Sequence, residues 1–249
     1  MTDKSQTTGG LLQDFEQLFP LSHWRRPPGC AELNDLWPEH APRSRGGSLR
    51  FVVQDDTLPF PTLSYAQRIA THGLIATRPD NWHDLFNALT WVQFPRTKLA
   101  LTERLADPAG TRDGRNRTPE HNALTLFDEC GVVLASTDPA FKAMHTAHDW
   151  RRLFVTHRAD FGRTIRPVVF GHGLADQARS PYVGLTAKAW YLPVGDAWMA
   201  QSLATRYAQV DERLAFSLPG TLTSPRQLLP LPVLGVPGWW DANRDPALS

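Results

Sequence analysis

Three side chains able to take part in acid–base or metal chemistry stand close together early in the chain. His83, Asp84 and Asn87 fall within one short helical pattern that is otherwise rich in large aromatic residues. On a helix His83 and Asn87 share a face, because residues four apart lie one above the other. His83 is then placed to act as a general base or metal ligand, with Asp84 as a carboxylate partner. The alternative is that Asp84 only favours the helix N-terminus and that His83 is a hydrogen-bonded core histidine.

Arg96 and Lys98 follow this pattern directly after Pro95. We expect their positive charges to bind the substrate and to stabilise negative charge that develops during a reaction. Asn87 and Trp82 are the further candidate substrate-binding residues, one through hydrogen bonds and one through its aromatic face. Two positive charges beside a hydrogen-bonding amide and an aromatic ring predict a phosphate-containing substrate.

A further histidine, His172, stands between Gly171 and Gly173 where a strand gives way to a helix. Flanking glycines permit unusual backbone angles and the close approach of a ligand. We therefore expect His172 to be catalytic, or to bind a divalent metal ion together with His83, with Asp176 placed to orient it. The alternative reading of Asp176 is a solvated surface carboxylate.

Asp128 and Glu129 form a carboxylate pair in what the pattern predicts to be a hairpin turn. Asp128 is the candidate third metal ligand, since carboxylates suit both acid–base and metal chemistry. The alternative is a turn residue whose side chain bonds the local backbone. His145 and His148 have a spacing that can bind metal on a helix, or are surface histidines.

The composition excludes several classes of protein. The chain has 249 residues with a net charge of +1, 41% hydrophobic and 20% charged residues, which is typical of a globular protein and gives no overall attraction to nucleic acid or to a membrane. There is no apolar leader and no apolar run of membrane-spanning length, and the two cysteines fit no paired pattern. We expect a cytoplasmic protein with reduced thiols.

The residue pattern predicts an α+β fold: a single domain from residue 11 to 249, with a small, mostly antiparallel sheet packed by several helices. Residues 1 to 10 are expected to be disordered, and the chain from about residue 216 is expected to form a Pro-rich extended tail. A hairpin joins two of the predicted strands. The predicted helices cover 11–19, 31–37, 65–72, 81–94, 97–105, 138–157, 172–179 and 195–214. The predicted strands cover 48–53, 123–127, 132–135, 165–170 and 185–192.

Several strings of this sequence occur in a fixed order in one known group of proteins. The chain resembles an uncharacterised bacterial family, domain of unknown function 3025, over roughly residues 15 to 240. The strings that carry the resemblance are Asn81–Trp91, Phe94–Lys98, Asn122–Glu129, Phe170–His172, Pro181–Tyr182 and Pro230–Trp239. Asn122 stands where the family pattern has Asp. The family has no established activity, so the resemblance leaves the function open.

Two hypotheses of function follow. The first is a hydrolase that acts on a phosphate-containing substrate, with His83, Asp84 and His172 as its catalytic residues and a divalent metal ion as a candidate cofactor. The second is a non-catalytic module that binds a protein or ligand through its aromatic residues, with histidines that are structural. Nucleic acid is among the partners that the second hypothesis allows, although it is not the favoured one.

Overall fold

The computed structural model describes residues 10–19, 21–107, 111–112 and 116–243. These residues group into two compact units: unit 1 comprises residues 1–23, 129–206 and 228–249, and unit 2 comprises residues 24–128 and 207–227. Each unit is assembled from separated stretches of chain. Two of the crossings fall inside helices, at α6 (Pro119–Cys130) and α10 (Leu203–Ser217). This interleaving is in keeping with the single domain expected from the sequence.

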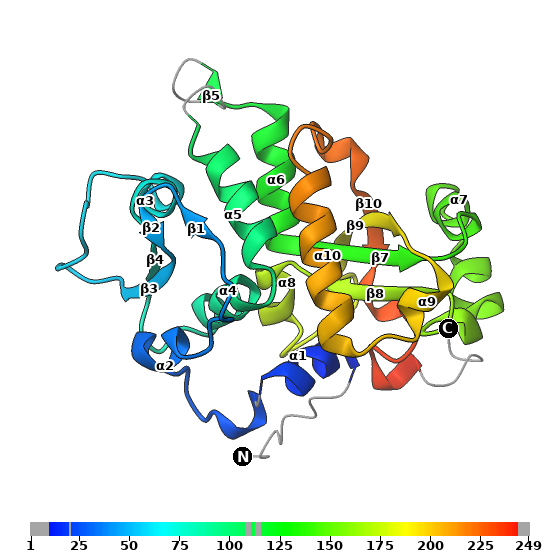
Figure 1. The fold of residues 1–249 in the computed structure, drawn as a ribbon. Helices are drawn as coiled ribbons and strands as arrows, with labels where there is room; N and C mark the ends of the chain where they lie inside the picture. Colours follow the sequence, from blue (N-terminus) through cyan, green and yellow to red (C-terminus); the bar gives the residue numbers. More distant parts are fainter. Residues whose placement is uncertain (1–9, 20, 108–110, 113–115, 244–249) are drawn as a thin grey trace. The chain divides into compact units, whose positions relative to one another are not determined.

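Unit 1 is built on a four-stranded sheet with the strand order β10-β9-β7-β8 (Figure 1). Strand β7 pairs parallel with β9 and antiparallel with β8, and β9 pairs antiparallel with β10. The sheet is therefore mostly antiparallel, as predicted. The strands are β7 (Gly131–Ser136), β8 (Ile165–Val169), β9 (Thr186–Pro193) and β10 (Leu229–Pro232).

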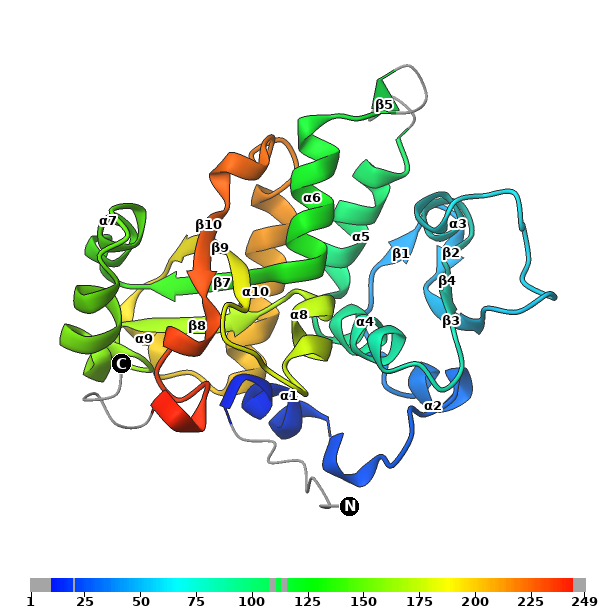
Figure 2. The ribbon, with the colours of Figure 1, turned by 180° about the vertical axis from the view of Figure 1, so that it is seen from behind.

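The sequence explains the order of these strands. All six residues of β7 are buried, and its run from Val132 to Ala135 is apolar throughout, which suits a strand covered on both faces. Strand β10 contains Pro230 and Pro232, which cannot donate ladder hydrogen bonds, and it lies at the edge of the sheet (Figure 2). The other elements of this unit are short helices that precede, connect or follow the strands: η1 (Gly10–Leu12), α1 (Gln13–Leu18), η2 (Leu21–His23), α7 (Ala140–Thr146), the π-helix η4 (Arg152–Thr156), η5 (Arg158–Asp160), α8 (His172–Gln177), α9 (Asp196–Met199), η7 (Val233–Gly235) and η8 (Asp241–Asn243).

Unit 2 begins with a compact β–α–β element. Strands β3 (Arg50–Val53) and β4 (Leu74–Thr77) pair in parallel and are joined through α3 (Tyr65–His72). The side chain of Asn34 on α2 (Cys30–Asn34) exchanges two hydrogen bonds with the backbone of Phe51, at 2.8 and 3.0 Å, and so takes the place of a further strand partner. The remaining elements are β1 (Arg43–Ser44), β2 (Gly47–Ser48), α4 (Trp82–Gln93), α5 (Pro95–Leu105), β5 (Thr111–Arg112), β6 (Asn116–Arg117) and η6 (Pro225–Gln227), with most of α6 and α10.

Helix α5 lies beside α6 in unit 2 (Figures 1 and 2). Arg104 on α5 donates to both carboxylate oxygens of Glu120 on α6 at 2.7 Å, and His121 Nε2 lies 2.9 Å from the carbonyl oxygen of Arg104. The N-terminus of α5 is capped from α10. Asp211 accepts from the backbone N–H groups of Arg96 and Thr97 at 3.1 and 2.8 Å, which satisfies two donors that have no partner within the helix.

The α+β class is confirmed, and several predicted elements are found where they were expected. Helix α3 ends at Gly73, whose φ of 70° is the left-handed conformation that glycine adopts most readily. Helix α4 begins after Asn81, whose side chain accepts from the backbone N–H of Asp84 at 3.0 Å. Among the described residues no helix has the length and hydropathy needed to cross a membrane. The predicted disordered stretch, residues 1 to 10, lies outside the described residues except for Gly10.

The predicted hairpin over residues 123 to 135 is wrong. Residues up to Cys130 belong to helix α6, and only the second apolar run, in β7, is a strand. Ala123, Leu124 and Phe127 are buried at helical spacing, and this one-sided burial stabilises a helix.

Two predicted helices are interrupted. The helix expected from 195 to 214 is two helices, α9 and α10, separated at residues 200–202. The helix expected from 138 to 157 stops at Thr146, because His148 adopts a φ of 55° that no α-helix accommodates, and it resumes as a π-helix. The predicted Pro-rich tail is not uniformly extended, since it contains short helical turns as well as β10.

Candidate functional site

The candidate site in unit 2 is positioned by α4 and α5. Leu85, Phe86 and Leu89 are buried and fix the orientation of α4 against the core. The helix ends at Gln93, and Pro95 starts α5 as its first residue, where its fixed φ is well suited. The sharp change of direction between the two helices brings Asn87 of α4 to Lys98 of α5.

Lys98 is the centre of a buried polar network, and its side chain is 2% exposed. Its ammonium group donates to Asp128 Oδ1 at 2.6 Å and to Asn87 Oδ1 at 2.9 Å. The same group lies 5.4 Å from the centre of the Trp91 ring, within the range of a cation–π contact. Lys98 therefore joins Asn87 and Asp128, and all three are residues that the sequence singled out.

Tyr65 completes this network from α3. Its hydroxyl oxygen accepts from Asn87 Nδ2 at 2.8 Å and from Trp91 Nε1 at 3.3 Å. Burial of the hydroxyl raises the pKa of Tyr65 well above its usual value, and this outweighs the opposite effect of the two hydrogen bonds. The phenol therefore stays protonated at neutral pH and can donate its own proton in a hydrogen bond.

Asp84 faces Arg78 within the same unit. The carboxylate accepts from the Arg78 backbone N–H at 2.7 Å, from Nε at 3.1 Å and from Nη2 at 2.6 Å. Burial acts to raise the pKa of Asp84, but the hydrogen bonds and charge of Arg78 outweigh it and hold the pKa below its usual value. Asp84 is thus an ionised carboxylate at neutral pH, and its catalytic role stays a prediction.

The other predicted residues of unit 2 are His83, Trp82 and Arg96. His83 and Trp82 are half-buried in the first turn of α4. The side chain of Arg96 is exposed, while its backbone N–H is bound by Asp211. Their roles in catalysis and substrate binding stay predictions, as does metal binding by Asp128, which lies in helix α6 rather than in the predicted turn.

His172 lies in unit 1, at the first position of α8, and is 5% exposed. Its Nε2 atom is 3.4 Å from Glu129 Oε1, and the Glu129 side chain is 43% exposed. Asp176, expected to orient His172, lies 3.4 Å from Arg179. The structure therefore pairs His172 with a carboxylate, although Glu129 was not the one assigned to it.

The glycines around His172 make this pairing sterically possible. A Cβ atom on Gly173 would stand 2.5 Å from Glu129 Oε2, and one on Gly171 would stand 2.6 Å from the carbonyl oxygen of Glu129. Side chains at either position would therefore occupy the space that Glu129 fills. The two glycines of the Gly-His-Gly sequence therefore allow Glu129 to lie close to His172.

The predicted site residues are divided between the two units. His172 belongs to unit 1, whereas His83, Asp84 and Asp128 belong to unit 2. A single site shared by His83 and His172 stays a prediction. The pair His145 and His148 does not share a helix, because α7 ends at Thr146, and His145 is a fully buried residue that bonds Tyr191 and the carbonyl of Pro230.

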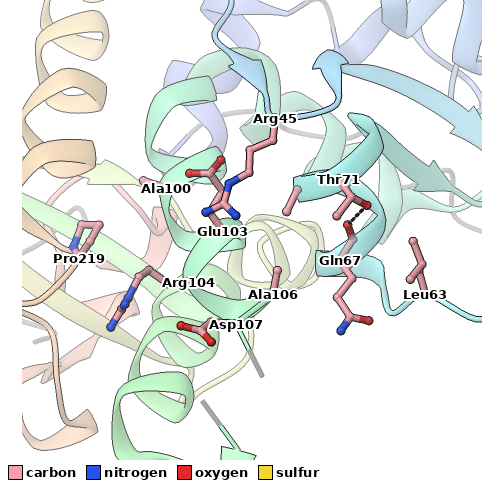
Figure 3. A pocket seen from close by; sticks show the side chains of 11 residues that line it. Arg45, Leu63, Gln67, Thr71, Ala100, Glu103, Arg104, Ala106, Asp107 and Pro219 are labelled. Atoms are coloured by element: carbon pink, nitrogen blue, oxygen red, sulfur yellow. Dashed lines mark hydrogen bonds between the residues drawn. The ribbon is translucent and has the colours of Figure 1, made fainter. Parts of the chain in front are cut away.

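Unit 2 also contains a cavity of about 640 Å³ beside the last turns of α5 (Figure 3). Its charged lining residues are Arg45, Glu103, Arg104 and Asp107, two of each sign, and the rest of its wall is largely apolar. Arg104 is already held by Glu120. None of the described residues that line this cavity is one that the sequence predicted to be functional, and its balanced charges favour no particular ligand.

Sequence reasoning missed Tyr65 as a member of the Lys98 network and Glu129 as the partner of His172. Tyr65 carries no local signal, since it is simply the first residue of a capped helix. Glu129 did carry one, because it stands next to Asp128 in a pair of carboxylates. Read as a helix, that pair has its two side chains about 100° apart, so two neighbouring carboxylates can serve different partners.

Comparison with known proteins identifies a family but no function. Searches of curated proteins and of solved structures gave no significant match to the chain. The sequence model of one protein family matches residues 49–248, which is most of the chain and includes segments of both units. The chain therefore belongs to the family described as protein of unknown function DUF3025.

Proposed function

We propose that the protein is a hydrolase in which His172 is the general acid–base residue and Glu129 is its carboxylate partner, acting on a phosphate-containing substrate. The observation that carries this proposal is the 3.4 Å separation between His172 Nε2 and Glu129 Oε1. Imidazole is the side chain best suited to proton transfer near neutral pH, and an adjacent carboxylate orients it and stabilises its charged form.

The surroundings of the pair support a functional role over a purely structural one. His172 is almost fully buried, while the Glu129 side chain is 43% exposed, so the pair extends from the interior to the surface. The Glu129 end of the pair is therefore open to solvent, while the imidazole is kept in a fixed position. Gly171 and Gly173 leave the room that Glu129 occupies beside His172.

The substrate class is the one that the residue types of the sequence predict. Within unit 2 the exposed Arg96 is the candidate for binding an anionic group, because Lys98 is already bound to Asp128 and Asn87. An arginine suits this task, because its planar guanidinium can bind phosphate oxygens in pairs. We propose a cytoplasmic location, where the free thiols of Cys30 and Cys130 stay reduced.

A divalent metal ion is a candidate cofactor of the proposed reaction. His172 and Glu129 offer an imidazole nitrogen and a carboxylate oxygen, two donor types that are common in zinc and manganese sites. When bound, such an ion would lower the pKa of a water molecule or polarise a phosphoryl oxygen. The assay below therefore includes conditions with and without metal.

The test is hydrolysis of p-nitrophenyl phosphate and bis(p-nitrophenyl) phosphate by the full chain, with Mg²⁺, Mn²⁺ or Zn²⁺ and with EDTA. Replacing His172 with Gln should lower kcat by about 10²- to 10⁴-fold, the usual contribution of a general acid–base residue. Glu129→Gln should lower it by about 10- to 100-fold, because the histidine loses its orienting partner. His23→Gln is the matched control, since His23 is an exposed histidine of the same unit.

Two results would count against the proposal. One is turnover that survives unchanged in His172→Gln, which would place the chemistry elsewhere. The other is no turnover of either ester under any metal condition, which would favour the alternative of a non-catalytic binding module. That alternative has its own support, since His121 and His145 are both buried histidines bonded to backbone carbonyls, as structural histidines are.

A further inference from the structure

Unit 1 contains a cavity of about 660 Å³ that is separate from the His172–Glu129 pair. Its wall is mainly apolar and aromatic, with Trp150, Phe154, Leu234 and Trp240 among its lining residues. A volume between about 300 and 1,000 Å³ with a mostly apolar lining and few polar groups is typical of sites for small molecules. The size and composition of this cavity are therefore those of a ligand site.

One wall of the cavity is formed by an unusual stretch of backbone. Trp150 precedes the π-helix η4, which contributes Phe154, and the backbone N–H of Asp149 already bonds across five residues to Met144. His148, just before this stretch, has a φ of 55°. Single π-helical turns are rare and are found frequently at functional sites, because they re-aim side chains that a regular α-helix would place elsewhere.

The aromatic surface of the cavity is held firmly in place. The rings of Trp150 and Phe154 stack with an angle of 9° and a centroid distance of 5.8 Å. The rings of His145 and His148 meet Trp150 edge-on at 5.4 and 5.3 Å. Gly235 lies against Phe154 so closely that a Cβ atom would stand 2.7 Å from Cε2. The shape of this wall is thus set before any ligand arrives, which lowers the entropic cost of binding.

A further part of the wall is fixed by the side chain of Asn243. Its Nδ2 group donates to the carbonyls of Leu234 and Gly235 at 2.8 and 3.0 Å, and its Oδ1 accepts from Arg158 at 3.1 Å. Asn243 and Arg158 are therefore engaged in building the wall and have little capacity left for a ligand.

Arg151 is different from these polar residues. It lines the cavity, its side chain is exposed, and within the part of the chain that the structure describes its guanidinium forms neither an ion pair nor a hydrogen bond. The next residue, Arg152, does not line the cavity and lies 3.9 Å from Asp149. The cavity thus combines flat aromatic walls with one available positive charge.

We propose that this cavity binds a small planar aromatic molecule that carries one negative charge, an aromatic carboxylate being the simplest example. Indole and phenyl rings favour stacking or edge contacts with another flat ring. A guanidinium binds a carboxylate through two parallel hydrogen bonds and tolerates an aromatic neighbour. This site is independent of the proposed hydrolase activity, and neither depends on the other being correct.

The test is isothermal titration calorimetry of the full chain with 2-naphthoate. Its neutral analogue 2-naphthamide has nearly the same shape and should bind at least about 10-fold more weakly, because it cannot form a charge-assisted pair with Arg151. Arg151→Gln should weaken naphthoate binding by at least about 10-fold and leave naphthamide unchanged. Trp240→Ala should weaken both compounds, since it removes part of the aromatic wall.

Arg152→Gln is the matched control, because it removes an adjacent exposed arginine outside the cavity and should leave the affinity for naphthoate unchanged. Thermal unfolding of each variant checks that the fold is retained, and both exposed arginine positions should tolerate the change. The proposal is overturned if naphthoate does not bind, if Arg151→Gln and Arg152→Gln weaken binding equally, or if flexible decanoate binds as tightly as naphthoate. Equal weakening would indicate general attraction to positive charge, and decanoate binding would indicate a site for lipid chains.

Discussion

Lys98 Nζ lies 2.6 Å from Asp128 Oδ1, and the lysine side chain is 2% exposed while the aspartate side chain is 21% exposed. The two residues are separated by 30 positions in the sequence and are joined only by the folding of α5 against α6. A lysine this deeply buried needs a partner, because an ammonium group without one is very costly to remove from water. Asp128 is therefore first of all the counter-charge of Lys98, whatever chemistry it also serves.

Replacing Asp128 with Asn should destabilise the protein by about 3–5 kcal/mol, since it leaves a buried charge without compensation. The measurement is the free energy of unfolding in urea. Arg104→Ala is the matched control, because it breaks a partly exposed ion pair with Glu120 and should cost less than about 1 kcal/mol. Equal costs for the two variants would show that the Lys98 pair is no more important than a surface pair.

The Asp84–Arg78 pair should make the stability of the fold depend on pH in the acidic range. The pKa of Asp84 is lowered in the folded protein, so its contribution is complete above the unfolded carboxyl pKa of about 4 and is lost as the pH falls through the lowered value. Asp84→Asn should cost about 1.5–3 kcal/mol at pH 7, because it removes hydrogen bonds to a charged group. The difference in melting temperature between wild type and variant should shrink steadily from pH 5 to pH 2. A difference that is constant over this range would contradict the assignment.

The two glycines that flank His172 should respond differently to alanine. Gly171→Ala forces a Cβ atom against the backbone of residues 129 to 131, which cannot move aside easily, and should cost about 1–3 kcal/mol or more. Gly173→Ala meets the end of the Glu129 side chain at 2.5 Å, which can rotate away, and the Glu129 carbonyl oxygen only at 3.1 Å, so stability should fall less while Glu129 leaves His172. Gly195→Ala, in open space, is the control for thermal unfolding. If Gly173→Ala is the more damaging change, Glu129 is less movable than its exposure indicates.

Arg68 should hold the exposed loop before α3 in its conformation. Its buried guanidinium group donates to the carbonyls of Pro59, Phe60 and Leu63 at 2.9–3.3 Å. Arg68→Met removes all three hydrogen bonds and should cost about 1.5–3 kcal/mol. Hydrogen exchange of residues 54–63 should become faster, while exchange of the β7 strand stays unchanged. Unchanged protection of the loop would show that the stacking of Phe60 on His72 is sufficient to hold it.

The elements that the sequence predicts well are those with local signals at both ends. Helix α3 has Ser64 as its N-cap and Gly73 as its left-handed end, and α4 begins at the cap residue Asn81. Helix α6 also has a start signal, because Thr118 accepts from the backbone N–H of His121 and Pro119 is its first residue. The run from Ala123 to Phe127 is by itself equally compatible with a buried strand and a buried helix. Asp128 and Glu129 are followed by Gly131, a composition that is common in turns, and the pattern therefore predicts a hairpin where the structure has a helix.

In the candidate site, too, the sequence predicts what depends on local signals and does not predict what depends on packing. Asn87, Lys98 and Asp128 could be chosen by residue type, because each carries a group suited to chemistry. Their bonding to one another depends on the packing of separate helices and could not be read from spacing. Tyr65 is bonded to Asn87 across 22 positions for the same reason.

Helix α5 is synthesised well before Asp211, the residue that caps it. Thr97 and Asp211 are 114 residues apart, and their hydrogen bonds close an element of unit 2 with a residue that follows most of unit 1. At a translation rate of about 5–20 residues per second, α5 leaves the ribosome roughly 6–23 seconds before its cap exists. Unit 2 therefore reaches its final form only after most of unit 1 has been synthesised, and a nascent chain that ends before α10 leaves the start of α5 open to chaperones and proteases.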